Sequence, residues 1–206
     1  MSLFIDKLKQ ASQSELPPMG FRTSQKSFKP RLLVVALVGQ GEVLNGVDIA
    51  DDIDAFLFTA QKAMELRAVE KKVKSLTDIP CGCRISGNYS IDLGKTGLDF
   101  VVFTDDIPAP PLLKSENIGR IIIAEVSMPV DIIRVLDTMP ADAIFLDDKS
   151  AEKFSLTWQQ MAVYKRFSAL SSKPLLTTVP MNLTADELQA IWDMGVDGLV
   201  VNVVDS

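Results

Sequence analysis

Acidic residues follow three successive strand-like segments of this chain. Asp105 comes after the apolar run 100–103, Glu125 lies near the end of 121–126, and Asp147 follows 143–146. If these segments are parallel strands, their carboxyl ends gather at one rim, and we expect the three carboxylates to converge there. Such a group can transfer protons or hold Mg²⁺ together with water and substrate. The alternative is that they cap helix N-termini and bind turn amides.

Two basic residues could take part in the same chemistry. Lys149 is a candidate Schiff-base lysine, although Asp147 and Asp148 just before it favour the protonated amine. Arg84 lies inside the apolar segment 81–85, where a charged side chain needs a partner. It can clamp a carboxylate or phosphate of a ligand, pair internally with Glu125 or Asp105, or point outward near a helix.

These positions give one set of candidate site residues. Glu125, Asp147 and Lys149 are the candidate catalytic residues. The candidate substrate-binding residues are Gln40, Arg84, Asp105 and Asn202. The sequence identifies neither a cofactor nor a definite metal site.

Composition excludes several classes of function. The 206 residues include no histidine, which removes His-activated serine or cysteine nucleophiles and His-ligated zinc. A net charge of −6 without a basic arm disfavours nucleic-acid binding. No apolar run is long enough for a membrane span or a secretory signal, so we expect a cytoplasmic protein. The two cysteines, Cys81 and Cys83, share one face of a predicted strand and are expected to be reduced core thiols.

A repeated four-residue pattern indicates the fold. An aspartate sits second in each copy and a short apolar run follows: Ile53-Asp54-Ala55-Phe56, Leu98-Asp99-Phe100-Val101, Ala141-Asp142-Ala143-Ile144 and Val196-Asp197-Gly198-Leu199. Four more apolar runs lie between them, at 32–38, 81–85, 121–126 and 174–179. Eight buried-type runs alternating with helical patterns predict a compact, TIM-like (β/α)8 barrel. An open doubly wound sheet is disfavoured, because Gly39-Gln40-Gly41 lacks the third glycine of the dinucleotide-binding fingerprint.

Helical periodicity and breakers give the connecting elements. Helices are predicted at 2–12, 60–76, 157–171, after Pro129 and after the capping box that begins at Thr184, with a short turn of helix at 111–116. The helices after the first, third and fourth strands are expected to be short and irregular, and no eighth helix is expected. We therefore expect residues 1–30 to form a helix with a polar lead-in, and 31–206 a single barrel domain. Without an eighth helix, an apolar flank beside the eighth strand would be exposed. The N-terminal helix or a partner chain, for example in a homo-oligomer, would cover it.

The four aspartates of the repeat are assigned to stability. Each one opens an even-numbered strand, at the end of the barrel opposite the proposed site. Their expected role is to accept hydrogen bonds from the backbone of the tight turn between helix and strand.

The C-terminal part of the chain resembles a known superfamily. Lys173-Pro174-Leu175-Leu176, a capped helix and Gly195-Val196-Asp197-Gly198-Leu199-Val200-Val201 are similar to the closing strand–helix–strand unit of the phosphate-binding TIM barrels. That superfamily includes sugar-phosphate enzymes of tryptophan and histidine biosynthesis and flavin-dependent barrels, and the pattern-level resemblance covers about 31–204. Two features depart from it. The segment 179–182 after the seventh strand has no glycine, and only three residues follow the eighth strand.

Two functions follow as hypotheses. The first is an enzyme, a lyase or isomerase, that acts on a small polar or phosphorylated metabolite at the carboxyl ends of the strands. The second is a non-catalytic barrel that serves as a binding or assembly module. A pocket that contains Arg84, Glu125 and Asp147 together favours the first. A mouth filled by apolar side chains such as Met128 or Met181 favours the second.

Overall fold

Eight parallel strands close into a barrel in the order in which they occur along the chain. The structure is a computed structural model that describes residues 2–12, 32–39, 53–60, 69, 73, 79–86, 93, 96–115, 117–147 and 156–203. The strands are β1 (Leu33–Val38), β2 (Ala55–Ala60), β3 (Cys81–Ile85), β4 (Phe100–Phe103), β5 (Gly119–Ala124), β6 (Ala143–Leu146), β7 (Leu175–Val179) and β8 (Gly198–Asn202). The predicted barrel is therefore confirmed, and strand ends differ from the predicted ones by at most two residues. β5 starts earlier than predicted, at Gly119 and Arg120, which carry no strand-like apolar signal.

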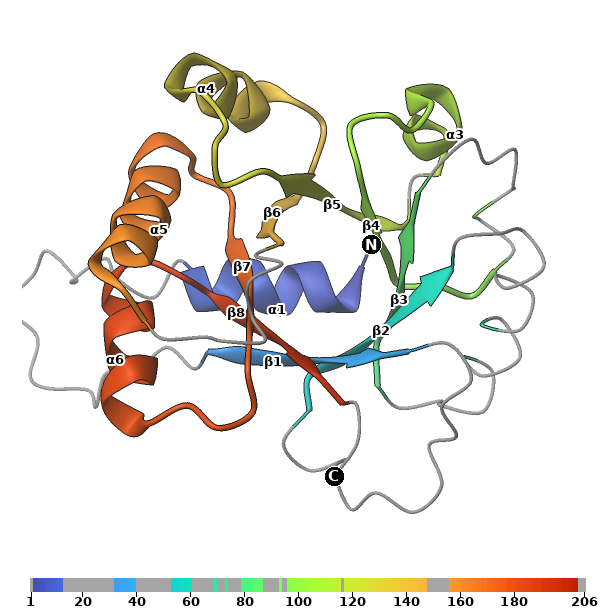
Figure 1. The fold of residues 1–206 in the computed structure, drawn as a ribbon. Coiled ribbons are helices and arrows are strands. Elements are labelled where there is room, and N and C mark those ends of the chain that lie inside the picture. The colour runs from blue at the N-terminus through green and yellow to red at the C-terminus, as the bar shows by residue number, and fades with distance from the viewer. Residues whose placement is uncertain are drawn as a thin grey trace, which may run out of the picture.

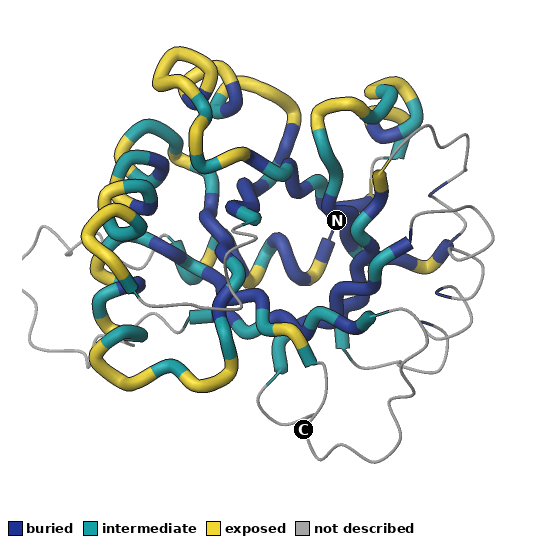
Figure 2. Tube along the Cα trace, viewed as in Figure 1, coloured by how far each residue is buried: buried dark blue, intermediate teal, exposed yellow. Residues whose placement is uncertain are grey.

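Among the described residues, helices cover part of the outside of the barrel, and one more lies across one of its ends (Figure 1). They are α1 (Leu3–Ser12), α3 (Ala109–Leu113), α4 (Val130–Thr138), α5 (Trp158–Leu170) and α6 (Ala185–Asp193). The outer faces of α4, α5 and α6 are exposed while the strands are buried (Figure 2). Both α5 and α6 begin with a capping box, at Thr157 with Gln160 and at Thr184 with Glu187. Among the residues described, no helix is long and apolar enough to cross a membrane.

One predicted helix is corrected and another is tested only in part. The turn expected at 111–116 instead begins at Ala109, because Pro110 and Pro111 fit the first helical turn, where no backbone N–H is required. Ala60, the first residue of the long helix predicted at 60–76, belongs to β2 instead, while the described positions Val69 and Val73 are helical and buried. The rest of that helix, and the connections after β1 and β3, lie mostly outside the described residues.

Helix α1 closes the end of the barrel at which the strands begin. Its buried side chains Phe4, Ile5 and Leu8 pack against inward-facing residues of the strands, including Phe100 and Leu176. The rings of Phe4 and Phe100 lie 4.7 Å apart. Viewed along the barrel, α1 lies inside the ring of strands (Figure 1). The expected N-terminal helix is thus present, but it fills the barrel floor rather than covering an outer flank.

Three aspartates of the repeat accept hydrogen bonds from the backbone, but from the neighbouring strand and not from the turn between helix and strand that was predicted. Carboxylate oxygens of Asp54, Asp142 and Asp197 accept from the backbone N–H of Val34, Arg120 and Leu175, respectively, at 3.0, 2.9 and 2.8 Å. In each case the partner is on the preceding, odd-numbered strand. The backbone N–H of each of the four aspartates also donates to a carbonyl of the preceding strand. Asp99 makes this bond to Cys81, but its carboxylate turns to α1.

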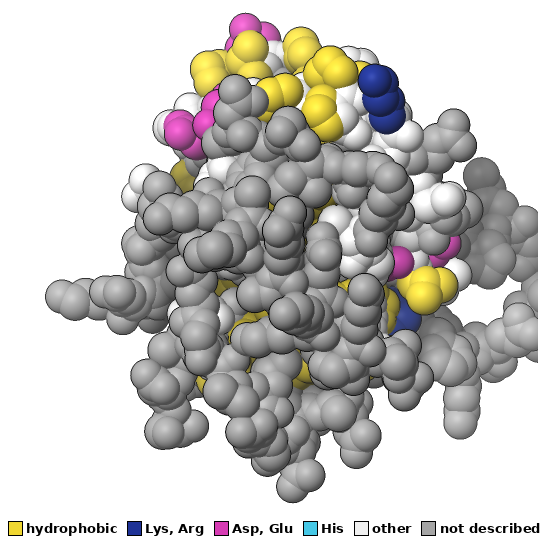
Figure 3. Space-filling view, turned by 90° about the vertical axis from the view of Figure 1, so that its right-hand side faces the viewer, with side chains coloured by type: hydrophobic (Ala, Val, Ile, Leu, Met, Phe, Trp, Pro, Cys, Tyr) yellow, Lys and Arg dark blue, Asp and Glu magenta, His cyan; other side chains and the backbone are white. Residues whose placement is uncertain are grey.

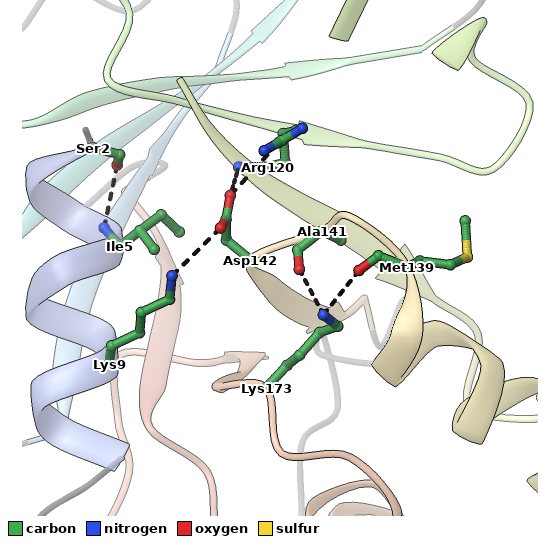
Figure 4. Close-up of polar contacts among 8 residues, drawn as sticks. All are labelled: Ser2, Ile5, Lys9, Arg120, Met139, Ala141, Asp142 and Lys173. Atoms are coloured by element: carbon green, nitrogen blue, oxygen red, sulfur yellow. Dashed lines mark hydrogen bonds and ion pairs between the residues drawn. The ribbon is translucent and has the colours of Figure 1, made fainter. Parts of the chain in front are cut away.

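Asp142 also links α1 to the barrel. The Nζ of Lys9 lies 3.5 Å from Asp142 Oδ1, and the Nε of Arg120 lies 3.7 Å from Oδ2 (Figure 4). Beside this group, the Nζ of Lys173 donates to the carbonyls of Met139 and Ala141. One aspartate therefore contacts β5 and α1 at once, while the lysine fixes the turn that precedes β6.

Candidate active site

A cleft of about 970 Å³ opens above the carboxyl ends of strands β3 to β6. Arg84 and Asp147 reach it from the ends of β3 and β6, and Thr104 and Asp105 from the residues after β4. Glu125, in the loop between β5 and α4, completes the set. Four of the seven predicted site residues therefore line one cleft: Arg84, Asp105, Glu125 and Asp147.

An ion pair spans the mouth of the barrel. Arg84 Nη2 lies 2.6 Å from Asp147 Oδ2, although β3 and β6 are separated in the sheet by β4 and β5. Strand periodicity explains the reach. Cys81, Cys83 and Ile85 pack in an outer cluster, so Gly82 and Arg84 face the barrel interior. Of the alternatives left open for Arg84, the structure shows an internal ion pair, but with Asp147 rather than with Glu125 or Asp105. Arg84 crosses to Asp147, which is the inward-facing position two residues beyond the buried Phe145.

Both side chains of this pair are partly shielded from water. Their exposed fractions are 26% for Arg84 and 14% for Asp147. A guanidinium has five N–H donors, and a single bond to Asp147 leaves it able to bind a ligand oxygen as well. Arg84 is therefore an oriented cation at the wall of the cleft.

Glu125 lies on the exposed loop that follows β5. Ser127 donates its hydroxyl to Glu125 Oε2 at 3.4 Å. The guanidinium of Arg166 on α5, which also lines the cleft, donates to the carbonyl of Val126 in the same loop. The loop that carries Glu125 is thus attached to α5 immediately beyond the glutamate. On the neighbouring loop Asp105 is exposed, and Thr104 donates to Asp106.

Of the three remaining predicted site residues, Asn202 is the one that the structure describes, and it does not join this group. Asn202 is exposed at the end of β8, beside Leu37 of β1, and does not line the cleft. Gln40 and Lys149 lie outside the described residues, so their roles stay predictions. Met128 forms part of the cleft wall, whereas Met181 is 72% exposed and is not among the lining residues.

The carboxylates do not form a metal site in the described part of the chain. No group of three or more Asp, Glu, Cys or His side chains there is placed to hold an ion. Asp147, one member of the trio considered from the sequence, is instead bound by the Arg84 guanidinium. The arginine supplies the positive charge that a metal would have brought.

The cleft wall that α5 contributes was not predicted from the sequence. Gln159, Ala162, Val163 and Arg166 all line the cleft. Their spacing of three, four and seven residues places them on one helical face. That periodicity was available in the sequence, where the helix at 157–171 was predicted without a role in the site.

Solved structures share this fold at low sequence identity. The tryptophan synthase of M. tuberculosis, in a ligand-free form, matches with a TM-score of 0.66 and 13% identity over 97% of this chain and 87% of that chain. A mutant tryptophan synthase alpha-subunit from Pyrococcus furiosus matches with a TM-score of 0.63 and 12% identity over 82% of this chain and 86% of that chain. No protein-family model and no curated protein matches the sequence. The chain is therefore a TIM barrel that resembles the phosphate-binding TIM barrels at the level of the fold.

Proposed function

We propose that this protein is an enzyme, a lyase or isomerase, that acts on a small polar metabolite, phosphorylated or not, in the cleft above β3–β6. One observation carries the proposal: Arg84, Asp105, Glu125 and Asp147, from four consecutive strands and their loops, line a single cleft. Its volume of about 970 Å³ is in the range of small-molecule sites. It also lies at the end of the barrel where the active sites of TIM-barrel enzymes lie.

The chemistry we propose is proton transfer next to a carbonyl group. Glu125 is exposed to the cleft and can accept a proton from a bound substrate. Arg84 can donate hydrogen bonds to the oxygen on which negative charge then develops. Asp147 holds the guanidinium from the other side of the mouth. Asp105 is available to accept a hydrogen bond from a substrate hydroxyl.

A metabolite screen tests binding first. The full chain is screened against polar and phosphorylated metabolites by thermal shift, and each stabilising compound is titrated by calorimetry. We expect Arg84→Met to weaken binding at least tenfold, because the variant loses a charge-assisted hydrogen bond. Asp186→Asn is the matched control, since Asp186 is a carboxylate on the first turn of α6 that does not line the cleft.

Turnover is measured on the compounds that bind. We expect Glu125→Gln to bind them with little change and to lower the rate by about 100-fold or more. A compound that binds in the cleft and is never converted, under any condition in which the wild type stays folded, would favour the binding module instead. Binding that survives Arg84→Met unchanged would place the ligand elsewhere.

A further inference from the structure

The cleft has two chemically different parts. The part at the strand ends is charged and includes Arg84, Asp105, Glu125 and Asp147. The part between α4 and α5 is mainly apolar and is lined by Val126, Met128, Pro129, Ile132, Ala162 and Val163. The only polar functional groups in this second part, among the residues described, are those of Gln159 and Arg166 on α5 and Ser127 at its edge.

The two helices are joined at one end and line the cleft at the other. At their C-terminal ends, Asp137 of α4 accepts from the hydroxyls of Ser171 and Ser172 and from the backbone N–H of Ser172, at 2.7–3.0 Å. Further up, Ile133 and Leu136 of α4 share a buried cluster with Tyr164 and Phe167 of α5. The cleft lies beyond this contact, where the first turn of α4 faces Ala162 and Val163.

Apolar side chains in the part of the cleft between α4 and α5 are in contact with water. Ile132 is 43% exposed, and the small Ala162 opposite it is also exposed. The upper edge of the molecule, where α3 and α4 lie, carries gathered hydrophobic side chains (Figure 3). A ligand that covers Ile132, Met128 and Val163 would remove apolar surface from water, which favours binding.

Arg166 lies at the boundary between the two parts. Its guanidinium donates to the carbonyl of Val126, next to Glu125, and its Nε is buried without a hydrogen-bond partner in the described part of the chain. Arg84 lines the same cleft, so a ligand carboxylate there has two guanidinium groups to which it can bind. A hydroxyl beside that carboxylate could donate to Glu125 or Asp105.

We infer that the ligand of this cleft is a small amphipathic hydroxy acid, with its carboxylate and hydroxyl among the strand-end charges and its apolar chain between α4 and α5. This inference rests on the proposed function, because it assigns the substrate class of the same site. It adds a requirement that the proposed function does not have: the affinity of the protein for the ligand must depend on the length of the ligand's apolar chain.

A homologous series of 2-hydroxyalkanoates, from glycolate to 2-hydroxyoctanoate, tests this by calorimetry on the full chain. We expect affinity to rise by about fourfold for each added methylene until the apolar part is filled. Ala162→Phe should remove this gain by occupying the space, while it leaves the affinity for the shortest acids unchanged. Ala169→Phe is the matched control, because Ala169 is exposed on the same helix, two turns further from the cleft.

The outcomes separate the inference from the proposed function. Equal affinity across the series, or an unchanged gain in Ala162→Phe, overturns the amphipathic ligand. If the amphipathic ligand is overturned in this way but the same acids lose affinity in Arg84→Met, the polar site of the proposed function is still supported. Failure of the whole series to bind overturns the hydroxy acid, and the metabolite screen with Arg84→Met then decides the proposed function separately. Circular dichroism and thermal unfolding of both phenylalanine variants verify that they are folded.

Discussion

Asp99, at the start of β4, accepts a hydrogen bond from the hydroxyl of Ser2, 97 residues away in the chain, at 2.7 Å. The same carboxylate accepts from the backbone N–H of Leu3 and of Phe4, at 2.7 and 2.9 Å. The hydroxyl of Ser2 in turn accepts from the N–H of Ile5 (Figure 4). The N–H groups at the start of a helix have no partner within the helix. Asp99 and Ser2 together satisfy the first three of α1, and so hold it against the barrel floor.

Replacing Asp99 should therefore release α1. We expect Asp99→Ala to lower the free energy of unfolding by about 2 kcal/mol, since the cap of a partly buried helix is lost. Urea unfolding followed by circular dichroism measures this. Amide hydrogen exchange at Leu3 and Phe4 should accelerate in Asp99→Ala but not in Asp54→Ala, where the lost acceptor served β1. Unchanged exchange at both positions would show that Asp99 does not hold the helix.

Position 82 must be glycine because the ring of Phe100, which packs against α1, leaves no space for a side chain there. A Cβ at Gly82 would lie 2.2 Å from Cε2 of Phe100, whose ring contacts Phe4 in the barrel interior. We expect Gly82→Ala to cost about 1–3 kcal/mol of stability, as overpacking of a filled core does. The smaller side chain of Phe100→Leu should relieve part of this cost. In a double-mutant cycle the two changes should then be less destabilising together than their sum, whereas strict additivity would contradict the clash.

The fold could be predicted from the sequence because its signals are local and repeated. Each even-numbered strand begins with an aspartate followed by apolar residues, and the apolar runs without polar alternation indicate strands buried on both faces. Capping chemistry placed the start of α6 at Thr184 correctly, through its reciprocal hydrogen bonds with Glu187. Each of these features depends on residues within a few positions of one another.

Features that depend on distant contacts were predicted less well. The sequence placed Arg84, Asp105, Glu125 and Asp147 at one rim, because the carboxyl ends of parallel strands must meet there. It could not show that Arg84 would pass the nearer carboxylates and pair with Asp147, since this depends on how far each side chain reaches across the mouth. The place of α1 beneath the barrel likewise depends on Asp99, whose carboxylate looks the same in sequence as those of the other three repeats.

The Arg84–Asp147 pair should show energetic coupling. Because both side chains are partly exposed, we expect a coupling free energy of about 1–2 kcal/mol, between the values for surface and for buried ion pairs. A cycle of Arg84→Met, Asp147→Asn and the double variant, each measured by chemical unfolding, gives this quantity. High salt should reduce the coupling only slightly, because the pair is partly shielded. A coupling near zero would mean that the two charges do not interact in solution.

Asp137 should make part of the stability dependent on pH. Burial acts to raise the pKa of Asp137, but hydrogen bonds from the backbone and hydroxyl of Ser172 and from Ser171, together with the charge of Lys173, outweigh it and lower the pKa below 3.8. The folded state therefore favours the ionised carboxylate. The contribution of this carboxylate to the free energy of unfolding is complete above pH 3.8, and it is lost as the pH falls through the lower pKa of the folded state.

Asp137→Asn tests this linkage. The variant should be less stable than the wild type at neutral pH, and the difference should shrink below pH 3.8, as the wild-type carboxylate takes up a proton. Urea unfolding at a series of pH values compares the two chains. Stability curves that run parallel through the acid range would contradict the role assigned to Asp137.

Cys81 and Cys83 should be unreactive in the folded protein. Neither forms a disulfide and both are buried, as expected from the sequence. Burial, and secondarily the negative charge of Asp99, raises the pKa of the Cys81 thiol to about 11. At pH 8 only about one Cys81 thiol in a thousand would be ionised, and the thiolate is the reactive form. We expect neither cysteine to react with a disulfide reagent in the native protein within minutes, and both to react in guanidinium. Rapid modification of one thiol without denaturant would mean that the barrel opens on the side of β3, against the buried packing of this strand.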